Sequence, residues 1–217
     1  MDLLSATGLA GAAGLNAYIP LLVFGLLARF TDVVNLPSGW QWLADPAMLT
    51  IVAVLLVIEF VADKIPVVDS LNDIIQTFVR PASGGLVFAS GLEAYGATEQ
   101  VTEGSALSEP GTLVAIGAGV IIAFVMHMFK STARPAVTVG TLGSGTAIVS
   151  AAEDTTSAGL SIAAVFLPIV AGLAVIGILV ALGYFAYKAV TWRRRRSERN
   201  ISEAQVTVEV DRYPYQE

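Results

Sequence analysis

The stretch EFVADKIPVVDSLNDIIQTFVRPA, residues 59–82, decides how the rest of the chain is interpreted. Only 14% of the residues in the chain are charged, yet this stretch begins inside a long apolar run and contains Glu59, Asp63, Lys64, Asp69, Asp73 and Arg80. A charged side chain at membrane depth is costly unless it is paired, hydrated or turned toward the interior of a helical bundle. The stretch therefore predicts a polar site inside an otherwise apolar fold.

Composition predicts an all-α integral membrane protein. Of the 217 residues, 55% are apolar, the mean hydropathy is +0.71, and several uncharged runs approach the length of a membrane span. Such a chain has room for about six transmembrane helices. We expect one polytopic membrane domain over residues 1–190 and a disordered tail, first basic and then acidic, over residues 191–217. The net charge of -6 says little, because the charges are sorted along the chain.

The residue inventory excludes several kinds of chemistry. The chain has no cysteine and one histidine, His127, which excludes disulfides, thiolate nucleophiles, cysteine-based metal sites and a multi-histidine metal site within one chain. We expect no cofactor, and we leave open whether carboxylates bind a metal ion. The expected partner is the lipid bilayer, with a small ion, an anionic solute or a second copy of the chain as further candidates, and no nucleic acid.

Hydropathy places six expected spans at residues 3–28, 47–64, 81–97, 111–129, 135–152 and 159–187. The first follows Asp2 instead of a basic region and is too long for a signal-peptide core, so we expect it to be retained. Pro20 and Pro168 predict kinks in the first and sixth spans. Residues 65–80 have the periodicity of an amphipathic connector, and Trp40 with Trp42 predicts an interfacial anchor.

Two spans share an opening tripeptide. Arg80 is followed by Pro and Ala at the start of the third span, Arg134 is followed by the same residues at the start of the fifth, and these spans finish at Glu93 and Glu153. The match suggests duplicated helical hairpins, as in many transporters, although generic helix-start chemistry explains the same residues. An arginine beside free helical N–H groups would favour an anion, whereas simple anchoring at the membrane surface needs no ligand.

The distribution of basic residues predicts an orientation. If the spans alternate and the arginines at 193–196 are cytoplasmic, every lysine and arginine except Arg29 lies on the cytoplasmic side, while the loops at 93–109 and 153–154 carry only acidic charges and face outward. This follows the positive-inside rule. We therefore expect a multi-pass protein of the bacterial plasma (inner) membrane with both termini in the cytoplasm.

Glu59 and Asp63 are the leading site candidates, because they lie one turn apart on the same face of the second span. Glu59 could pair with Lys64, Arg80 or Arg134 to fix the bundle, or it could bind a proton or a cation. Asn16, beside Pro20, could line the same site or simply pack against another helix. The alternatives for Asp69 and Asp73 are membership of this site or exposure to solvent, and for His127 proton transfer or packing.

These features predict a small secondary transporter or channel that uses an intramembrane carboxylate site for a proton or cation. A membrane scaffold that organises partners without transport is the alternative. An enzyme is disfavoured: the run from Arg80 is similar to that of lipid-phosphate phosphatases, which need catalytic histidines. Asp63, Asp69 and Asp73 do not supply the spacing of the intramembrane phosphatidyl transferases.

Three motifs carry a resemblance to a known family. GLNAYIP at residues 14–20, EFVADKIPVVD at residues 59–69 and RPA at residues 80–82 resemble an uncharacterised bacterial family of small multi-spanning inner-membrane proteins, catalogued as a domain of unknown function. The resemblance covers roughly residues 5–185 and implies a membrane protein of unassigned activity. The second motif is also distantly similar to the Glu-x-Gly-Asp-Lys motif of cation exchangers related to the lysine exporters; here the spacing is one residue longer and the glycine is missing.

Overall fold

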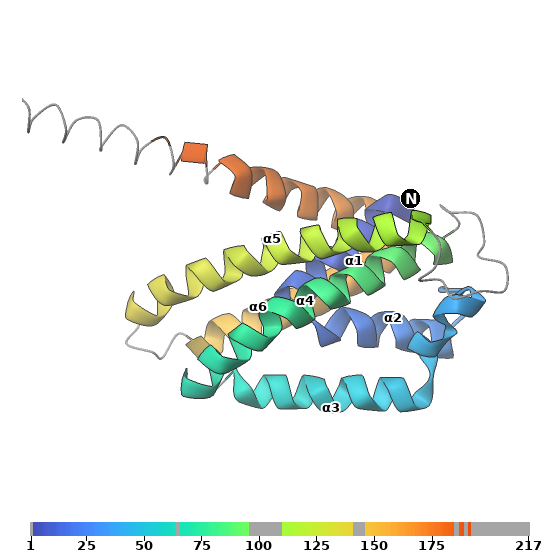
Figure 1. Cartoon of the computed structure of the whole chain (residues 1–217), viewed down its shortest axis with the longest axis horizontal. Coiled ribbons are helices and arrows are strands. Elements are labelled where there is room, and N and C mark those ends of the chain that lie inside the picture. The colour runs from blue at the N-terminus through green and yellow to red at the C-terminus, as the bar shows by residue number, and fades with distance from the viewer. Residues whose placement is uncertain are drawn as a thin grey trace, which may run out of the picture. The chain divides into compact units, whose positions relative to one another are not determined.

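The computed structural model describes residues 2–63, 66–95, 110–140, 146–184, 187–188 and 191, and in this part of the chain every regular element is a helix. Figure 1 shows the helices in chain order: α1 Asp2–Leu15, α2 Tyr18–Phe30, the 3-10 helix η1 Ser38–Ala44, α3 Pro46–Ala62, α4 Pro66–Ala94, α5 Pro110–Gly140 and α6 Thr146–Phe166, followed by a helix at Pro168–Tyr184. The all-α fold class is confirmed for these residues. The chain divides into two compact units, Met1–Gly177 and Ile178–Glu217, and the contacts described below lie within the first.

The single span expected over residues 3–28 is wrong, because the structure breaks it into α1 and α2 at Asn16 and Ala17. Pro20, where a kink was expected, lies in the first turn of α2. The N–H groups of a first helical turn have no intrahelical partner, so a proline there removes no hydrogen bond and need not bend the helix.

The two helices form a hairpin that enters the bundle and returns. Ser83 donates a hydrogen bond to the Ala17 carbonyl (2.5 Å), whereas Gly91 packs near Ala6 and Leu9, so α1 runs antiparallel to α4. Along α2, Tyr18 lies near Glu59 and Gly25 packs against Leu49, so α2 runs antiparallel to α3. The outer ends of the hairpin therefore lie at the same end of the bundle (Figure 1), and Asn16 at its tip is buried.

Two long helices continue through positions where the sequence predicted the start of a new span. The connector at 65–80 and the third span form one helix, α4, with Pro81 in its interior. The fourth span, the basic residues at 130–134 and the start of the fifth span likewise form one helix, α5. Arg80 and Arg134 therefore lie in helix interiors. The prediction that they open two duplicated helices beside free N–H groups is wrong.

The last part of the first unit also differs from expectation. Glu153 and Asp154 lie within α6 and not in an outward-facing loop. The expected sixth span is interrupted at Leu167, and Pro168 begins a new helix there instead of kinking an existing one. Proline is suited to that position because the first helical N–H has no intrahelical acceptor.

Glycines bring α4 and α5 together at their crossing. The α carbon of Gly119 lies so close to α4 that an added methyl group would meet the Gly84 backbone carbonyl and the Phe88 Cβ, the latter at 2.5 Å. Gly84 makes the reciprocal approach to Ala123 and to the Gly119 carbonyl. Small residues at facing positions allow helix backbones to approach in this way. This packing aligns the central part of α4 with the central part of α5.

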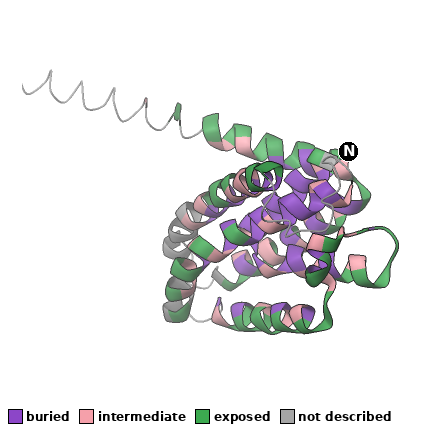
Figure 2. Ribbon diagram, turned by 45° about the vertical axis from the view of Figure 1, so that its right-hand side comes forward, coloured by how far each residue is buried: buried purple, intermediate pink, exposed green. Residues whose placement is uncertain are grey.

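Many large apolar side chains are exposed, while several charged side chains are buried. Figure 2 shows where buried and exposed residues lie along the helices. On α3, the exposed apolar residues are Ile51, Val54, Leu55, Val57, Ile58, Phe60 and Val61, whereas Glu59 is buried. Among the described residues, the segment Pro110–Ser131 of α5 is long and apolar enough to cross a membrane by itself, and η1 with α3 meets the same test as a pair bent by 51°. The helices Leu3–Leu15, Tyr18–Phe30 and Pro168–Tyr184 are apolar but shorter.

We predict that Gly119→Ala lowers the free energy of unfolding by ~1–3 kcal/mol, the usual cost of overpacking. The backbone of α4 blocks the added methyl group. Gly117→Ala is the matched control, because nothing lies within 4 Å of its added Cβ and alanine favours a helix over glycine. Thermal unfolding of the purified variants measures both changes, and equal stability of the two would contradict the close approach.

Candidate functional site

A buried ion pair joins the middle of α4 to the last turn of α3. The Arg80 Nη2 donates to the Glu59 Oε1 at 2.9 Å, and the side chains are 0% and 2% exposed. Glu59 faces inward on a helix whose other faces are apolar, and Arg80 faces inward near the centre of a 29-residue helix. Of the partners considered for Glu59, Arg80 forms this pair, and the side chains of the other two, Lys64 and Arg134, lie outside the described residues.

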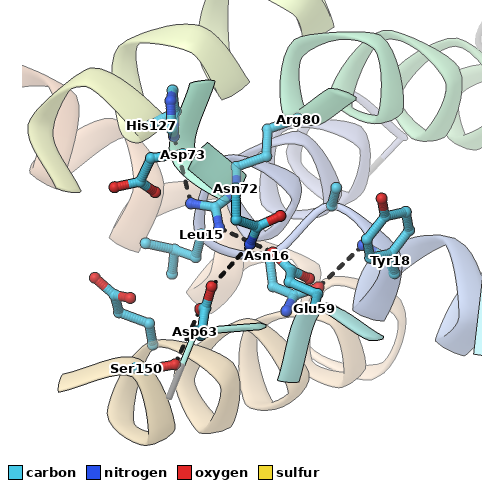
Figure 3. A network of polar contacts seen from close by, with 12 residues as sticks. Leu15, Asn16, Tyr18, Glu59, Asp63, Asn72, Asp73, Arg80, His127 and Ser150 are labelled. Atoms are coloured by element: carbon cyan, nitrogen blue, oxygen red, sulfur yellow. Dashed lines mark hydrogen bonds and ion pairs between the residues drawn. The ribbon is translucent and has the colours of Figure 1, made fainter. Parts of the chain in front are cut away.

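His127 of α5 lies on the other side of the guanidinium group (Figure 3). Arginine can only donate hydrogen bonds, so the contact between Arg80 Nη1 and His127 Nδ1 at 3.3 Å makes Nδ1 the acceptor and leaves the proton on Nε2. That proton points to the Thr77 hydroxyl at 3.2 Å, which in turn donates to the Asp73 carbonyl at 2.8 Å. His127 is therefore a neutral, packed member of the network.

Within the described part of the chain, three polar atoms at this pair have no hydrogen-bond partner. They are Glu59 Oε2, Arg80 Nε and Gln76 Oε1, and each belongs to a buried side chain. Gln76 lies one turn before Arg80 on α4, and Tyr18 from α2 interacts with Gln76. Buried polar atoms are nearly always satisfied in native proteins, so this grouping marks a place where a ligand, a proton or a water molecule would be accommodated.

Asn16 holds the tip of the α1–α2 hairpin. Its Oδ1 accepts from the backbone N–H groups of Tyr18 (3.0 Å) and Ile19 (3.1 Å), and its Nδ2 donates to Asp154 of α6 at 2.9 Å. The first contacts satisfy N–H groups that the start of α2 would otherwise leave unpaired. Asn16 therefore caps the returning helix and fixes it to α6.

Lys130 of α5 supports the other side of the tip. Its ammonium group donates to the Leu15 carbonyl at 3.0 Å and forms an ion pair with Glu153 of α6 at 2.8 Å. The Leu15 carbonyl ends α1 and has no helical partner of its own, so a cation is well placed there.

Asp63 forms a second polar cluster one turn beyond Glu59. Its carboxylate accepts from Asn72 of α4 at 2.9 Å and from Ser150 of α6 at 3.0 Å. Figure 3 shows this cluster beside the Glu59 and Arg80 pair. The polar site thus joins α3, α4 and α6 as well as the hairpin tip.

The structure brings together part of the predicted site. Asn16, Glu59, Asp63 and Arg80 lie in one polar network, and their role in binding an ion or substrate stays a prediction. Asp73 lies half-buried on α4, one turn before Thr77. Lys64 and the side chains of Asp69 and Arg134 lie outside the described residues.

Several network members were not predicted as site residues: Tyr18, Asn72, Gln76, Thr77, Lys130, Ser150 and Asp154, together with His127 and Glu153, which were given other roles. The spacing of Asn72, Gln76 and Arg80 by four residues could have shown a polar face on α4. The three-residue spacing of His127 and Lys130 could have done the same for α5.

A separate buried cluster lies at the other end of α4. Glu93 was expected in an exposed loop, but it is 5% exposed and accepts hydrogen bonds from the Trp40 indole N–H and the Thr112 hydroxyl, each at 2.7 Å. Trp40 is therefore a core residue and not an interfacial anchor, whereas Trp42 is exposed. This contact fixes η1 against α4 and α5.

Among the described residues, no three His, Asp or Glu side chains lie together in a way that could hold a metal ion. The described cluster instead combines carboxylates with arginine, lysine, amides and a neutral histidine. The described part of the chain is thus a helical bundle with a polar cluster in its interior, beside the tip of the α1–α2 hairpin.

Comparison with known proteins identifies the family. The family described as a domain of unknown function, DUF4126, matches residues 3–188, and the chain belongs to that family. Neither the curated proteins nor the solved structures contain a match.

We predict strong coupling between Glu59 and Arg80. Glu59→Gln or Arg80→Gln alone should cost ~3–5 kcal/mol of stability, because each leaves a buried charge without its partner. The double variant removes both charges and should lose clearly less than the sum of the single losses. Unfolding of the four proteins measures this double-mutant cycle.

The control cycle combines Arg80→Gln with Glu93→Gln. These residues lie 13 positions apart on one helix, about 20 Å, so their effects should add within ~0.5 kcal/mol. Additivity in the Glu59 cycle as well would show that the ion pair contributes no coupling.

Proposed function

We propose that this chain is an integral protein of the bacterial plasma membrane. The support is the inverted distribution of its side chains: the exposed residues of α3 are largely apolar, and Glu59, Arg80 and His127 are buried. A soluble protein would place such large apolar side chains inside. Lipid would cover the apolar faces, and the enclosed charges would be compensated by one another.

The helix directions suggest a topology that differs from six alternating spans. α3, α4, α5, α6 and the helix Pro168–Tyr184 would each cross once, while α1 and α2 would enter and leave on one side. Residues 64–65 and 141–145 would then be cytoplasmic, in keeping with Lys64, Lys130, Arg134 and the arginines at 193–196. The C-terminus would stay cytoplasmic, but the start of α1 would lie on the outer side, in contrast to the expectation of two cytoplasmic termini.

We infer that the protein is a small secondary transporter or channel for a proton or small ion, and not an enzyme. The observation that carries this proposal is the buried ion pair of Glu59 and Arg80 beside the tip of the α1–α2 hairpin. Each of the two side chains also has one polar atom without a hydrogen-bond partner among the described residues. Transporters place their binding sites at such helix breaks, where backbone and side-chain polar groups face an internal site. A scaffold would need neither the buried charges nor the break.

Single cysteines test the topology, because the natural chain has none. With a membrane-impermeant thiol reagent, Gln100→Cys and Asp2→Cys should be labelled from outside, and Ser70→Cys only after the inner face is exposed. Labelling of position 100 only from the inner face, or of position 70 from outside, would contradict the proposed topology. Inner-face labelling of position 2 would restore the single first span.

Reconstituted vesicles test transport. Vesicles containing the natural protein should show proton flux in the presence of a transported ion, and Glu59→Gln should reduce it at least tenfold, since the titrating carboxyl is gone. Glu93→Gln is the matched control because it neutralises another buried carboxyl away from the pair. Equal flux through the natural protein, Glu59→Gln and protein-free vesicles, across a panel of ions, would leave the scaffold as the function.

A further inference from the structure

We propose that the Arg80 site binds one small monocarboxylate together with one proton, the proton on Glu59 and the carboxylate on Arg80. The inference rests on the transport function proposed above for its physiological meaning, since the pair would then cross the membrane together. Its chemistry follows from the geometry of the ion pair and can be tested by binding alone.

Arg80 carries a permanent positive charge. A guanidinium group stays protonated in proteins, and Arg80 is fully buried, so it requires a negative partner in every state of the site. Glu59 supplies that partner in the structure. Lys130 is a poor competitor for an incoming anion, because it is already held by Glu153 and the Leu15 carbonyl.

Protonation of Glu59 changes the charge balance of the site. A proton that arrives at Glu59 neutralises its carboxylate and leaves Arg80 without a counter-charge. A monovalent anion then restores neutrality: one proton and one anion enter, and the net charge of the site is unchanged. Each therefore strengthens the binding of the other, as linkage requires.

Glu59 is the proton acceptor because its neighbours are committed elsewhere. The titratable and charged groups around it are Tyr18 of α2, Asp63 of α3, Arg80 of α4, His127 and Lys130 of α5, and Asp154 of α6, which is reached through Asn16. Asp63 is bonded through both of its oxygens, and Arg80 holds His127 Nδ1 as an acceptor. Glu59 Oε2, by contrast, has no hydrogen-bond partner among the described residues and can accept a proton.

The hydrogen-bond donors of the Arg80 guanidinium group indicate the class of anion. The Glu59 carboxylate accepts from Nη2 of the guanidinium group, whereas Nε has no hydrogen-bond partner among the described residues. A carboxylate that accepts from both nitrogens would form the planar arrangement of two hydrogen bonds that arginine favours. A monocarboxylate carries the single negative charge that Arg80 requires, and a protonated Glu59 that releases Nη2 could donate a hydrogen bond to it.

Formate is the probe. Purified Glu59→Ala, which vacates the place of the carboxylate, should unfold at a lower temperature than the natural protein, and sodium formate should restore its stability with saturation. Formamide and an equal ionic strength of sodium chloride should not. Formate should not raise the unfolding temperature of the double variant Glu59→Ala with Arg80→Gln. It should not raise that of Glu93→Ala either, because this substitution removes a buried carboxylate whose hydrogen-bond donors are uncharged.

The natural protein gives an independent reading if Glu59→Ala does not fold. At pH values at which Glu59 is deprotonated in the formate-free protein, its formate affinity should rise tenfold for each unit by which the pH falls. The reason is that one proton is bound with each anion. Glu59→Gln should bind formate with no such pH dependence. Formate binding that is absent, independent of Arg80, or independent of pH in the natural protein overturns the inference.

These outcomes separate the two proposals. Proton flux that depends on Glu59, without formate binding, would keep the transporter and remove its carboxylate substrate. Proton-linked formate binding without any flux through the natural protein would keep this site and remove the transport function.

Discussion

A buried guanidinium group cannot lose its charge, and this constraint organises the interior of the protein. α4 places Arg80 at the centre of the bundle, where it is fully buried. α3 must then bring Glu59 to it, and α5 must present His127 as an uncharged acceptor on the other side. The crossing of α4 and α5 is close because glycines allow it, so the packing and the charge compensation depend on one another. Removing the charge would remove the reason for the polar interior.

The sequence predicted the helical class and four of the network residues, since charge is rare in this chain and costly in an apolar interior. It could not choose among Lys64, Arg80 and Arg134 as the partner of Glu59, because that choice depends on distances between helices. Helix boundaries were less predictable. Pro81 lies within a helix where it suggested a start, and Pro20 lies at a start where it suggested a kink. Hydropathy also could not show that residues 3–28 turn back, because one long span and two short helices have the same composition.

The break between α1 and α2 exposes backbone groups that side chains from neighbouring helices satisfy. The Leu15 and Ala17 carbonyls accept hydrogen bonds from Lys130 and Ser83. The Ala12 carbonyl, which accepts from the Asn16 N–H, also accepts from Ser157. These three side chains come from α5, α4 and α6, so the hairpin tip is fixed by three helices at once. Buried backbone groups outside regular helices need such partners, because an unpaired buried N–H or carbonyl group is costly.

The contact of Glu93 with Trp40 has a mechanical consequence. Arg80 and Glu93 lie on one helix, about 20 Å apart at 1.5 Å per residue. Arg80 lies near the inner tip of the hairpin, and Glu93 holds η1, which follows the hairpin's outer end. The segment from Ala17 to Trp40 is thus attached to α4 at two separated points, through Ser83 and through Glu93. A displacement of α4 along its axis would move both attachments together, so a local event at the ion pair could be transmitted to the opposite end of the bundle without any deformation between them.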